Sequence, residues 1–286
     1  MITEVLQQVL NGLAIGSVYT LIAVGLTIVF GILGIAHFAH GSAAMSGGYL
    51  TFILTERLGL GFFPAMAVAL IAGAALGVVL ERLAYRPVRD APQINAFIIA
   101  LGLTMILEGG NLLLFGPDQV VIPTPYQRVY TVGGLVVAEL RIQVMLTAAL
   151  AVAAMAIFVS RTRAGRSIRA VAQNRQAAVL MGVNADAVAT MVFALSSALG
   201  VIGGALVGAL LAIAPGVGEG LVVKGFAVLI LGGLGSIPGA IVGGLVLGVS
   251  EALAAGFISS AYKDVIAFLV MIGVLLVRPE GLLGKR

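Results

Sequence analysis

Three ionisable side chains lie within apolar stretches of the sequence, where they could carry a proton or bind a cation. His37 and His40 are three positions apart, so on a helix they would share one face. Because zinc sites use at least three protein ligands, two histidines alone do not predict a metal site. Glu108 would need a partner at membrane depth, and Asn111, one helical turn away, is the expected one. We expect Glu108 to be a structural residue whose carboxyl group is hydrogen-bonded, in preference to a functional residue.

No catalytic residue is expected in this chain. It contains no cysteine, so thiolate chemistry and disulfides are excluded. None of its three lysines is followed by serine or threonine, so it has no nucleotide-binding P-loop. We therefore expect no metal and no cofactor here, and any ATP and Mg²⁺ would be bound by other subunits. Glu219, Lys224 and Glu251 fall near the ends of predicted segments, where solvated or snorkelling side chains are expected.

The composition places these residues in a membrane protein. Of 286 residues, 60% are apolar and 10% are charged, and the mean hydropathy is +1.15. A soluble domain is excluded, because it would be about 25% charged. The sequence predicts an all-α polytopic membrane protein in one domain, 1–286, with about eight or nine transmembrane segments of roughly 20 residues each, one or two of them broken or re-entrant. The apolar stretches are 9–30, 36–54, 62–81, 94–115, 143–160, 190–213, 222–234, 237–257 and 262–277.

The basic residues predict the orientation in the membrane. Eleven of the sixteen lie in three segments, at 82–89, at 161–175 and at the C-terminus with Arg278, Lys285 and Arg286. Short loops rich in Lys and Arg stay on the cytoplasmic side, so the loop at 161–187 and the C-terminus are expected there. Segment 116–142 then forms an external cap, and counting spans places the N-terminus outside. Because the positions of the basic residues are explained by membrane topology, no nucleic-acid partner is expected.

Glycine-rich breaks interrupt one apolar stretch in each half of the chain, at 31–41 and at 232–239. The second break contains Pro238 and cannot continue as one straight helix, which divides this region into segments 222–234 and 237–257. Paired interruptions of this kind indicate a substrate path. The candidate residues for the path are His37, His40, Ser42, Glu108, Gly235 and Ser236. Pairs of glycines four apart, such as Gly12 and Gly16 or Gly244 and Gly248, are interpreted as helix-packing sites.

The cytoplasmic loop contains a short amphipathic helix. Apolar residues such as Ile168 and Val171 follow helical spacing from Gly165 onward, Gly182 supplies a stop, and Asn184 supplies a cap for the next span. We expect this helix to insert into a partner protein, and the alternative is a basic helix lying on anionic membrane lipid. The candidate coupling residues are Arg169, Gln173, Asn174, Arg175 and Gly182.

Five motifs in order resemble the branched-chain amino acid ABC transporter permeases of the LivH type. They are NGLAIGS at 11–17, FAHG at 38–41, the loop at 169–184, LGGLGSIPGA at 231–240 and RPEGL at 278–282. The resemblance implies a permease subunit in a bacterial inner membrane, whose cytoplasmic helix couples it to two ATP-binding cassette subunits. It also implies a second permease subunit, or a homodimer, and a periplasmic substrate-binding protein.

Two positions depart from the pattern of that family. His37 stands where many relatives have Asn, and Ser42 stands where they have an acidic residue. The expected substrate is a branched-chain or similar small amino acid, and permeases for urea or short amides stay open as an alternative. An ion-coupled secondary carrier or channel, with Glu108 or His40 as proton carrier, is the other alternative.

Overall fold

The computed structural model describes residues 1–89 and 91–284, and within them the chain folds into eleven α-helices and one two-stranded sheet. The first half contains α1 (Ile2–Leu33), α2 (Ala39–Glu56), α3 (Phe62–Leu80), a π-helical turn (Glu81–Tyr85), a 3-10 turn (Arg86–Val88), α4 (Gln93–Phe115), β1 (Val129–Val132) and β2 (Leu135–Ala138). The second half contains α5 (Glu139–Arg161), α6 (Arg163–Gln173), α7 (Arg175–Leu180), α8 (Ala185–Leu210), α9 (Val217–Gly232), α10 (Ile237–Phe257), a 3-10 turn (Ser260–Tyr262) and α11 (Lys263–Val277). The predicted cytoplasmic residues Lys285 and Arg286 lie outside the described residues.

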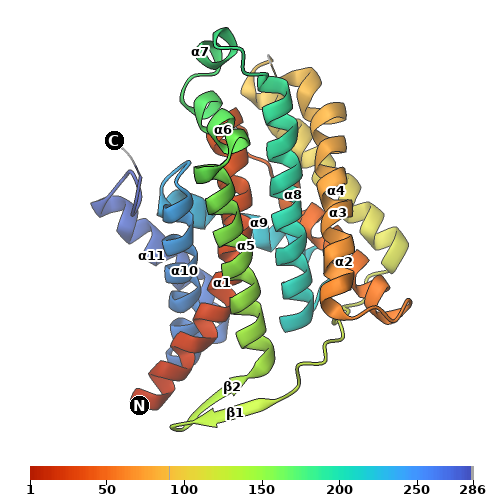
Figure 1. The fold of residues 1–286 in the computed structure, drawn as a ribbon. Coiled ribbons are helices and arrows are strands. Elements are labelled where there is room, and N and C mark those ends of the chain that lie inside the picture. Colours follow the sequence, from red (N-terminus) through yellow and green to blue (C-terminus); the bar gives the residue numbers. More distant parts are fainter. Residues whose placement is uncertain (90, 285–286) are drawn as a thin grey trace.

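Seven of the described helical segments are long and apolar enough to cross a membrane, and the all-α polytopic fold class is confirmed. Two further helices, α2 with 18 residues and α9 with 16, complete the set. Together these nine segments match the nine predicted apolar stretches. Helix α1 lies at the centre, where it packs against α10, α8, α9 and α5, while α4 and α11 lie at the periphery (Figure 1).

Glycine allows α1 and α10 to pack with their backbones in contact. A Cβ atom on Gly248 would lie 2.4 Å from the Cα atom of Gly16, and one on Gly16 would lie 2.7 Å from the carbonyl oxygen of Gly244. No larger side chain fits at such a crossing. The interpretation of these glycine pairs as packing sites is confirmed.

The two ends of the bundle differ in charge. The arginine-rich loops after α3 and around α6 and α7 lie at one end (Figure 1), where Arg86 pairs with Asp186 at 2.7 Å. The N-terminus and the β1–β2 hairpin lie at the other end, where the Gln7 side chain bonds the backbone of Val136 at 2.9 and 2.8 Å. Segment 116–142, which itself contains Arg128 and Arg141, therefore covers the end opposite the arginine-rich loops.

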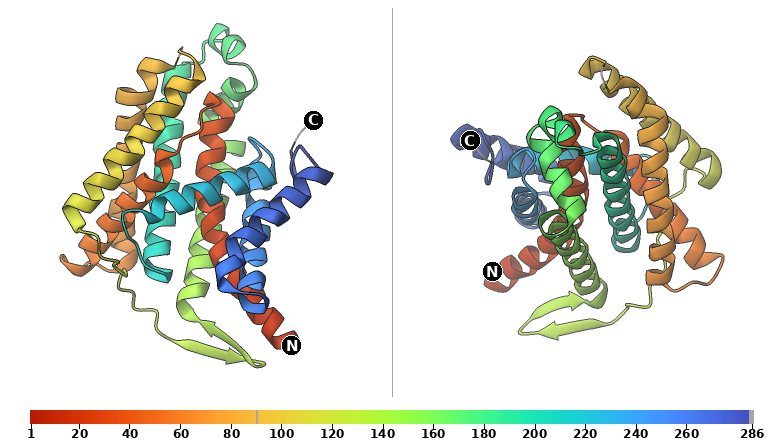
Figure 2. Two further views of the ribbon diagram at one scale, coloured as in Figure 1. Left: turned by 180° about the vertical axis from the view of Figure 1, so that it is seen from behind. Right: turned by 45° about the horizontal axis from the view of Figure 1, so that its top comes forward.

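The second glycine-rich break separates α9 from α10. Helix α9 crosses the bundle obliquely at mid-depth (Figure 2, left) and ends at Gly232, and the hydroxyl of Ser236 caps α10 by accepting a bond from the Gly239 amide at 3.1 Å. Helices α1, α2 and α10 surround α9, as an interrupted helix at membrane depth requires. A Cβ atom on Gly31 would lie 3.5 Å from the Cα atom of Gly235, so the two predicted breaks meet in space.

Candidate translocation pocket and docking helices

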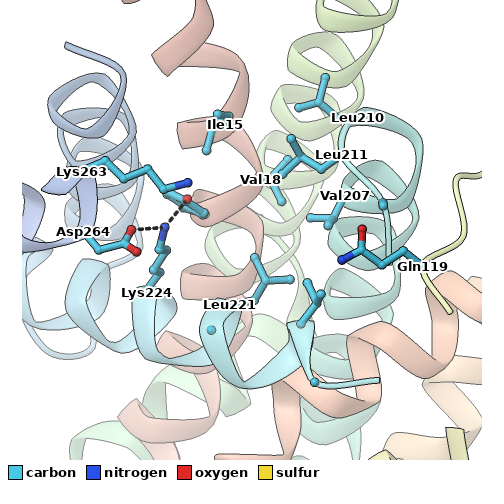
Figure 3. A pocket seen from close by; sticks show the side chains of 15 residues that line it. Ile15, Val18, Gln119, Val207, Leu210, Leu211, Leu221, Lys224, Lys263 and Asp264 are labelled. Atoms are coloured by element: carbon cyan, nitrogen blue, oxygen red, sulfur yellow. Dashed lines mark hydrogen bonds and ion pairs between the residues drawn. The ribbon is translucent and has the colours of Figure 1, made fainter. Parts of the chain in front are cut away.

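A pocket of about 440 Å³ lies between α1, α9, the ends of α8 and α11, and the segment after α4 (Figure 3). Its volume is within the range of small-molecule sites, ~300–1,000 Å³. One part of its wall is aliphatic and the other part carries amide and charged groups. The lining includes Ile15, Val18, Tyr19, Gln119, Val207, Leu210, Leu221, Lys224, Lys263 and Asp264.

An ion cluster drawn from four helices contributes Tyr19, Lys224 and Asp264 to the polar wall of this pocket, while its fourth member, Glu251, is not among the lining residues. The ammonium of Lys224 on α9 lies 2.8 Å from a carboxylate oxygen of Glu251 on α10 and 2.9 Å from one of Asp264 on α11. The same ammonium donates to the hydroxyl of Tyr19 on α1 at 2.9 Å, and that hydroxyl donates to Glu251 at 2.7 Å. One cation is thus paired with two carboxylates.

The expectation that Lys224 and Glu251 are solvated residues near segment ends is wrong. Their side chains are 15% and 5% exposed. Lys224 lies in the middle of α9, and Glu251 lies well inside α10. Since α9 crosses the interior, a charged residue on it must be paired. Glu219, by contrast, is exposed as expected.

The first break buries both histidines. His37 precedes α2 and His40 lies in its first turn; both are fully buried and their ring centroids are 5.8 Å apart. The Nδ1 atom of His37 lies 2.7 Å from the hydroxyl of Tyr85, and that of His40 lies 3.3 Å from the hydroxyl of Ser196. Within residues 1–89 and 91–284, no three His, Asp or Glu side chains gather in a way that could hold a metal ion.

Glu108 has a partner, but the predicted partner was wrong. The hydroxyl of Ser42 donates to Glu108 at 3.1 Å, while Asn111 donates to the hydroxyl of Ser46 at 3.1 Å. Both α4 side chains face α2, so they bond across the helix interface rather than to each other.

The structure brings the predicted path residues together only in part. The histidines meet at the first break, Ser42 meets Glu108 between α2 and α4, and Gly235 with Ser236 lies at the second break. None of these six residues lines the pocket. The pocket's charged groups were missed, although opposite charges on separate apolar segments are the signal that could have indicated them.

Helix α6 is amphipathic and rests on the end of α5. Thr162 caps its start by accepting a bond from the Gly165 amide at 2.9 Å, and Ile168 and Val171 are its buried apolar residues. The guanidinium of Arg169 donates to the carbonyl of Val159 on α5. A candidate coupling residue therefore fixes α6 to the membrane helix.

The expected single amphipathic helix is in fact two helices. Asn174 adopts an extended backbone conformation, ends α6, and accepts a bond from the Ala177 amide at 2.9 Å as the cap of α7. Gly182 has φ +84° and ends this region, as predicted. The tip carries exposed apolar side chains: Leu180 is 87% exposed and Met181 is 84% exposed.

A partly buried ion network lies behind α7. Arg89 donates to Glu81 at 2.6 Å and also pairs with Asp186, at the start of α8. Thr190 donates to the second oxygen of Glu81 at 2.7 Å, and Arg86 binds Asp186 at the exposed edge. Two of the arginines interpreted as topology markers thus join the loop after α3 to α8.

Comparison with known proteins assigns the family. Residues 8–275 match the family described as branched-chain amino acid transport system / permease component. The chain belongs to this family. The permease is 38% identical over 294 residues to the high-affinity branched-chain amino acid transport system permease protein BraD of Pseudomonas aeruginosa, and 37% identical over 298 residues to LivH of Escherichia coli strain K12. Both alignments cover 98% of this chain and 96% of the relative.

A more distant sequence match and a structural match also extend over most of the chain. The autoinducer 2 import system permease protein LsrC of Yersinia enterocolitica is 27% identical over 284 residues, covering 94% of this chain and 71% of LsrC. The solved structure of PsaBC from Streptococcus pneumoniae in complex with Fab aligns with a TM-score of 0.50 and 14% identity, over 94% of this chain and 91% of that one. At this identity the structural match shows the fold alone.

Proposed function

We propose that this permease is the membrane-spanning subunit of an ATP-driven importer for branched-chain or similar small amino acids, and that it is not itself an enzyme. The relatives BraD and LivH, named for branched-chain amino acid transport, match it over nearly their whole length. The sequence carries no P-loop, so ATP and Mg²⁺ would be bound by two partner ATPase subunits.

The observation that carries the proposal is the exposed apolar tip of α7. Leu180 and Met181 lie at the arginine-rich end, which the positive-inside rule assigns to the cytoplasm. Exposed large apolar groups at the end of a rigid helical pair fit a protein groove better than water. Because Arg169 and Gly165 hold α6 against α5, movement of a bound ATPase would pass directly to the membrane helices. We propose that Gln173, Asn174, Arg175 and Gly182 shape the docking surface formed by α6 and α7.

The same assignment orients the rest of the molecule in a bacterial inner membrane. The C-terminus would then be cytoplasmic, and the hairpin end, with the pocket, would face the periplasm and a substrate-binding protein. A second permease subunit, related or identical, would complete the path. The residues proposed to border the translocation path are His37 and His40 at the first break, Ser42 and Glu108 between α2 and α4, and Gly235 and Ser236 at the second break.

The docking surface can be tested with a charge variant. Leu180→Glu combined with Met181→Glu should abolish co-purification of the ATPase subunits and ATP-dependent leucine uptake, because two carboxylates would have to be buried in the partner's groove. Val132→Glu is the matched control, since Val132 is 68% exposed at the opposite end. Intact co-purification of the double variant would contradict docking and favour a helix lying on lipid.

Uptake specificity separates the alternative functions. Reconstituted complex should accumulate leucine, isoleucine or valine when ATP is supplied, and an uncoupler should not reduce this uptake. Accumulation of urea or short amides in place of amino acids would support the alternative solute class. Uptake that does not depend on ATP, and that is abolished by an uncoupler or by Glu108→Gln, would support an ion-coupled carrier.

A further inference from the structure

The Lys224 cluster brings one ammonium and two carboxylates together beside an open pocket, whose lining also includes Lys263. Lys224 contacts two carboxylates, and its side chain is only 15% exposed. Burying ions is expensive unless each has well-placed partners. Of the two carboxylates that Lys224 contacts, only that of Asp264 lines the pocket, so Asp264 is the one accessible to the ammonium group of a ligand.

The two carboxylates differ in how firmly they are held. Glu251 is 5% exposed and also accepts a bond from Tyr19 at 2.7 Å. Asp264 is 50% exposed, lines the pocket, and among the described residues is paired with Lys224 alone. The ion pair between Lys224 and Asp264 is thus the contact of the cluster that can open toward the pocket (Figure 3).

We infer that the pair formed by Lys224 and Asp264 is a binding site for the zwitterionic head of an amino acid, and that the substrate enters by replacing this internal ion pair. The substrate carboxylate accepts bonds from Lys224, and the substrate ammonium donates to Asp264. This inference rests on the proposed import of amino acids and adds the residues that would recognise them. Glu251 and Tyr19 keep Lys224 in place during the exchange.

The exchange explains how a zwitterion could leave water at low cost. Every charge that loses its internal partner gains one from the substrate, so the number of paired charges rises while the net charge of the pocket stays constant. Neutral amides and urea cannot replace either member of the ion pair, so the closed pair discriminates against them. The aliphatic wall formed by Ile15, Val18 and Leu221 provides a surface for an apolar substrate side chain.

The test uses the complete transporter in proteoliposomes with its binding protein, and radiolabelled L-leucine as the probe. Asp264→Asn and Lys224→Gln should each raise the half-saturating concentration of substrate-loaded binding protein about tenfold, which corresponds to ~1.4 kcal/mol, because each removes one of the two charge-assisted contacts with the substrate. Asp264→Glu keeps the carboxylate and should restore uptake to within about threefold of the wild type. Glu219→Gln is the matched control, an exposed acid on α9 outside the pocket lining.

The readouts separate recognition from folding and from the proposed function itself. Melting temperatures of the purified variants identify any variant that has lost its structure. If Asp264→Asn is such a variant, the uptake of Asp264→Glu is compared with that of the wild type instead. Asn and Gln variants that match the wild type in half-saturation, or that lower only the maximal rate in step with the melting temperature, would overturn the inference. A wild-type complex without ATP-dependent leucine uptake would instead overturn the proposed function.

Discussion

Removing the carboxylate of Glu81 should destabilise this permease far more than removing the guanidinium of Arg86, although both belong to one ion network. The side chains of Glu81 and Arg89 are 1% and 9% exposed and lie 2.6 Å apart. The side chains of Arg86 and Asp186 are 45% and 42% exposed. The two substitutions therefore probe one buried and one solvated ion pair on the same loop.

The difference in magnitude follows from this burial. In Glu81→Ala the guanidinium of Arg89 loses its buried partner and keeps only the half-exposed Asp186. The expected cost is therefore at or below the ~3–5 kcal/mol of removing one member of a buried pair. Thr190 also loses its acceptor. In Arg86→Ala a solvated pair worth ~0–1 kcal/mol is lost, and Asp186 keeps Arg89 as its partner. Glu81→Gln should fall between them, because an amide oxygen can still accept both bonds without the charge.

The assay is unfolding of the purified permease in mixed micelles, followed by circular dichroism as the fraction of denaturing detergent rises. We expect the midpoint for Glu81→Ala to fall well below that for Arg86→Ala, with Glu81→Gln between the two. Equal midpoints for the two alanine variants would refute the argument that the ion pair between Glu81 and Arg89 contributes more to stability because it is buried.

Two further substitutions test local packing and capping. Gly248→Leu should destabilise the fold by ~1–3 kcal/mol through overpacking against Gly16. Gly273→Ala on α11, where a Cβ atom meets open space, should be neutral or slightly stabilising when both variants are compared by the same detergent unfolding. Asn174→Ala should remove the cap of α7 at a cost of ~1 kcal/mol, and faster amide hydrogen exchange at Ala177 would show it; unchanged exchange would argue that the cap does not hold α7.

Hydropathy and helix-breaking residues predicted most of the fold. The break at 232–239 produced the predicted start of α10 at Ile237 and an end of α9 within two residues of the predicted one, because Gly and Pro limit the backbone locally. The placement of α9 inside the bundle, between α1, α2 and α10, depends on contacts with these distant segments and not on its own sequence. For that reason Lys224 was expected to be solvated and is instead paired inside the bundle.

In the region of α6 and α7, too, local features could be predicted from the sequence and longer-range ones could not. Gly182 and Asn184 stop and cap helices as predicted, since each acts through its own backbone or side chain within four residues. Asn174, a predicted coupling residue, also interrupts the helix and caps α7, which was not predicted. Spacing of apolar residues cannot distinguish one amphipathic helix from two in tandem. The exposed Leu180 and Met181 also depend on that break, because it redirects α7 away from the membrane helices.

Leucine accumulation driven by ATP in proteoliposomes tests the central claim most directly. The complete complex should concentrate radiolabelled leucine inside vesicles that have no proton or sodium gradient, and omission of the ATPase subunits should reduce accumulation to the level of empty vesicles. Accumulation that persists without the ATPase subunits would contradict the account of this chain as a passive permease driven through α6 and α7.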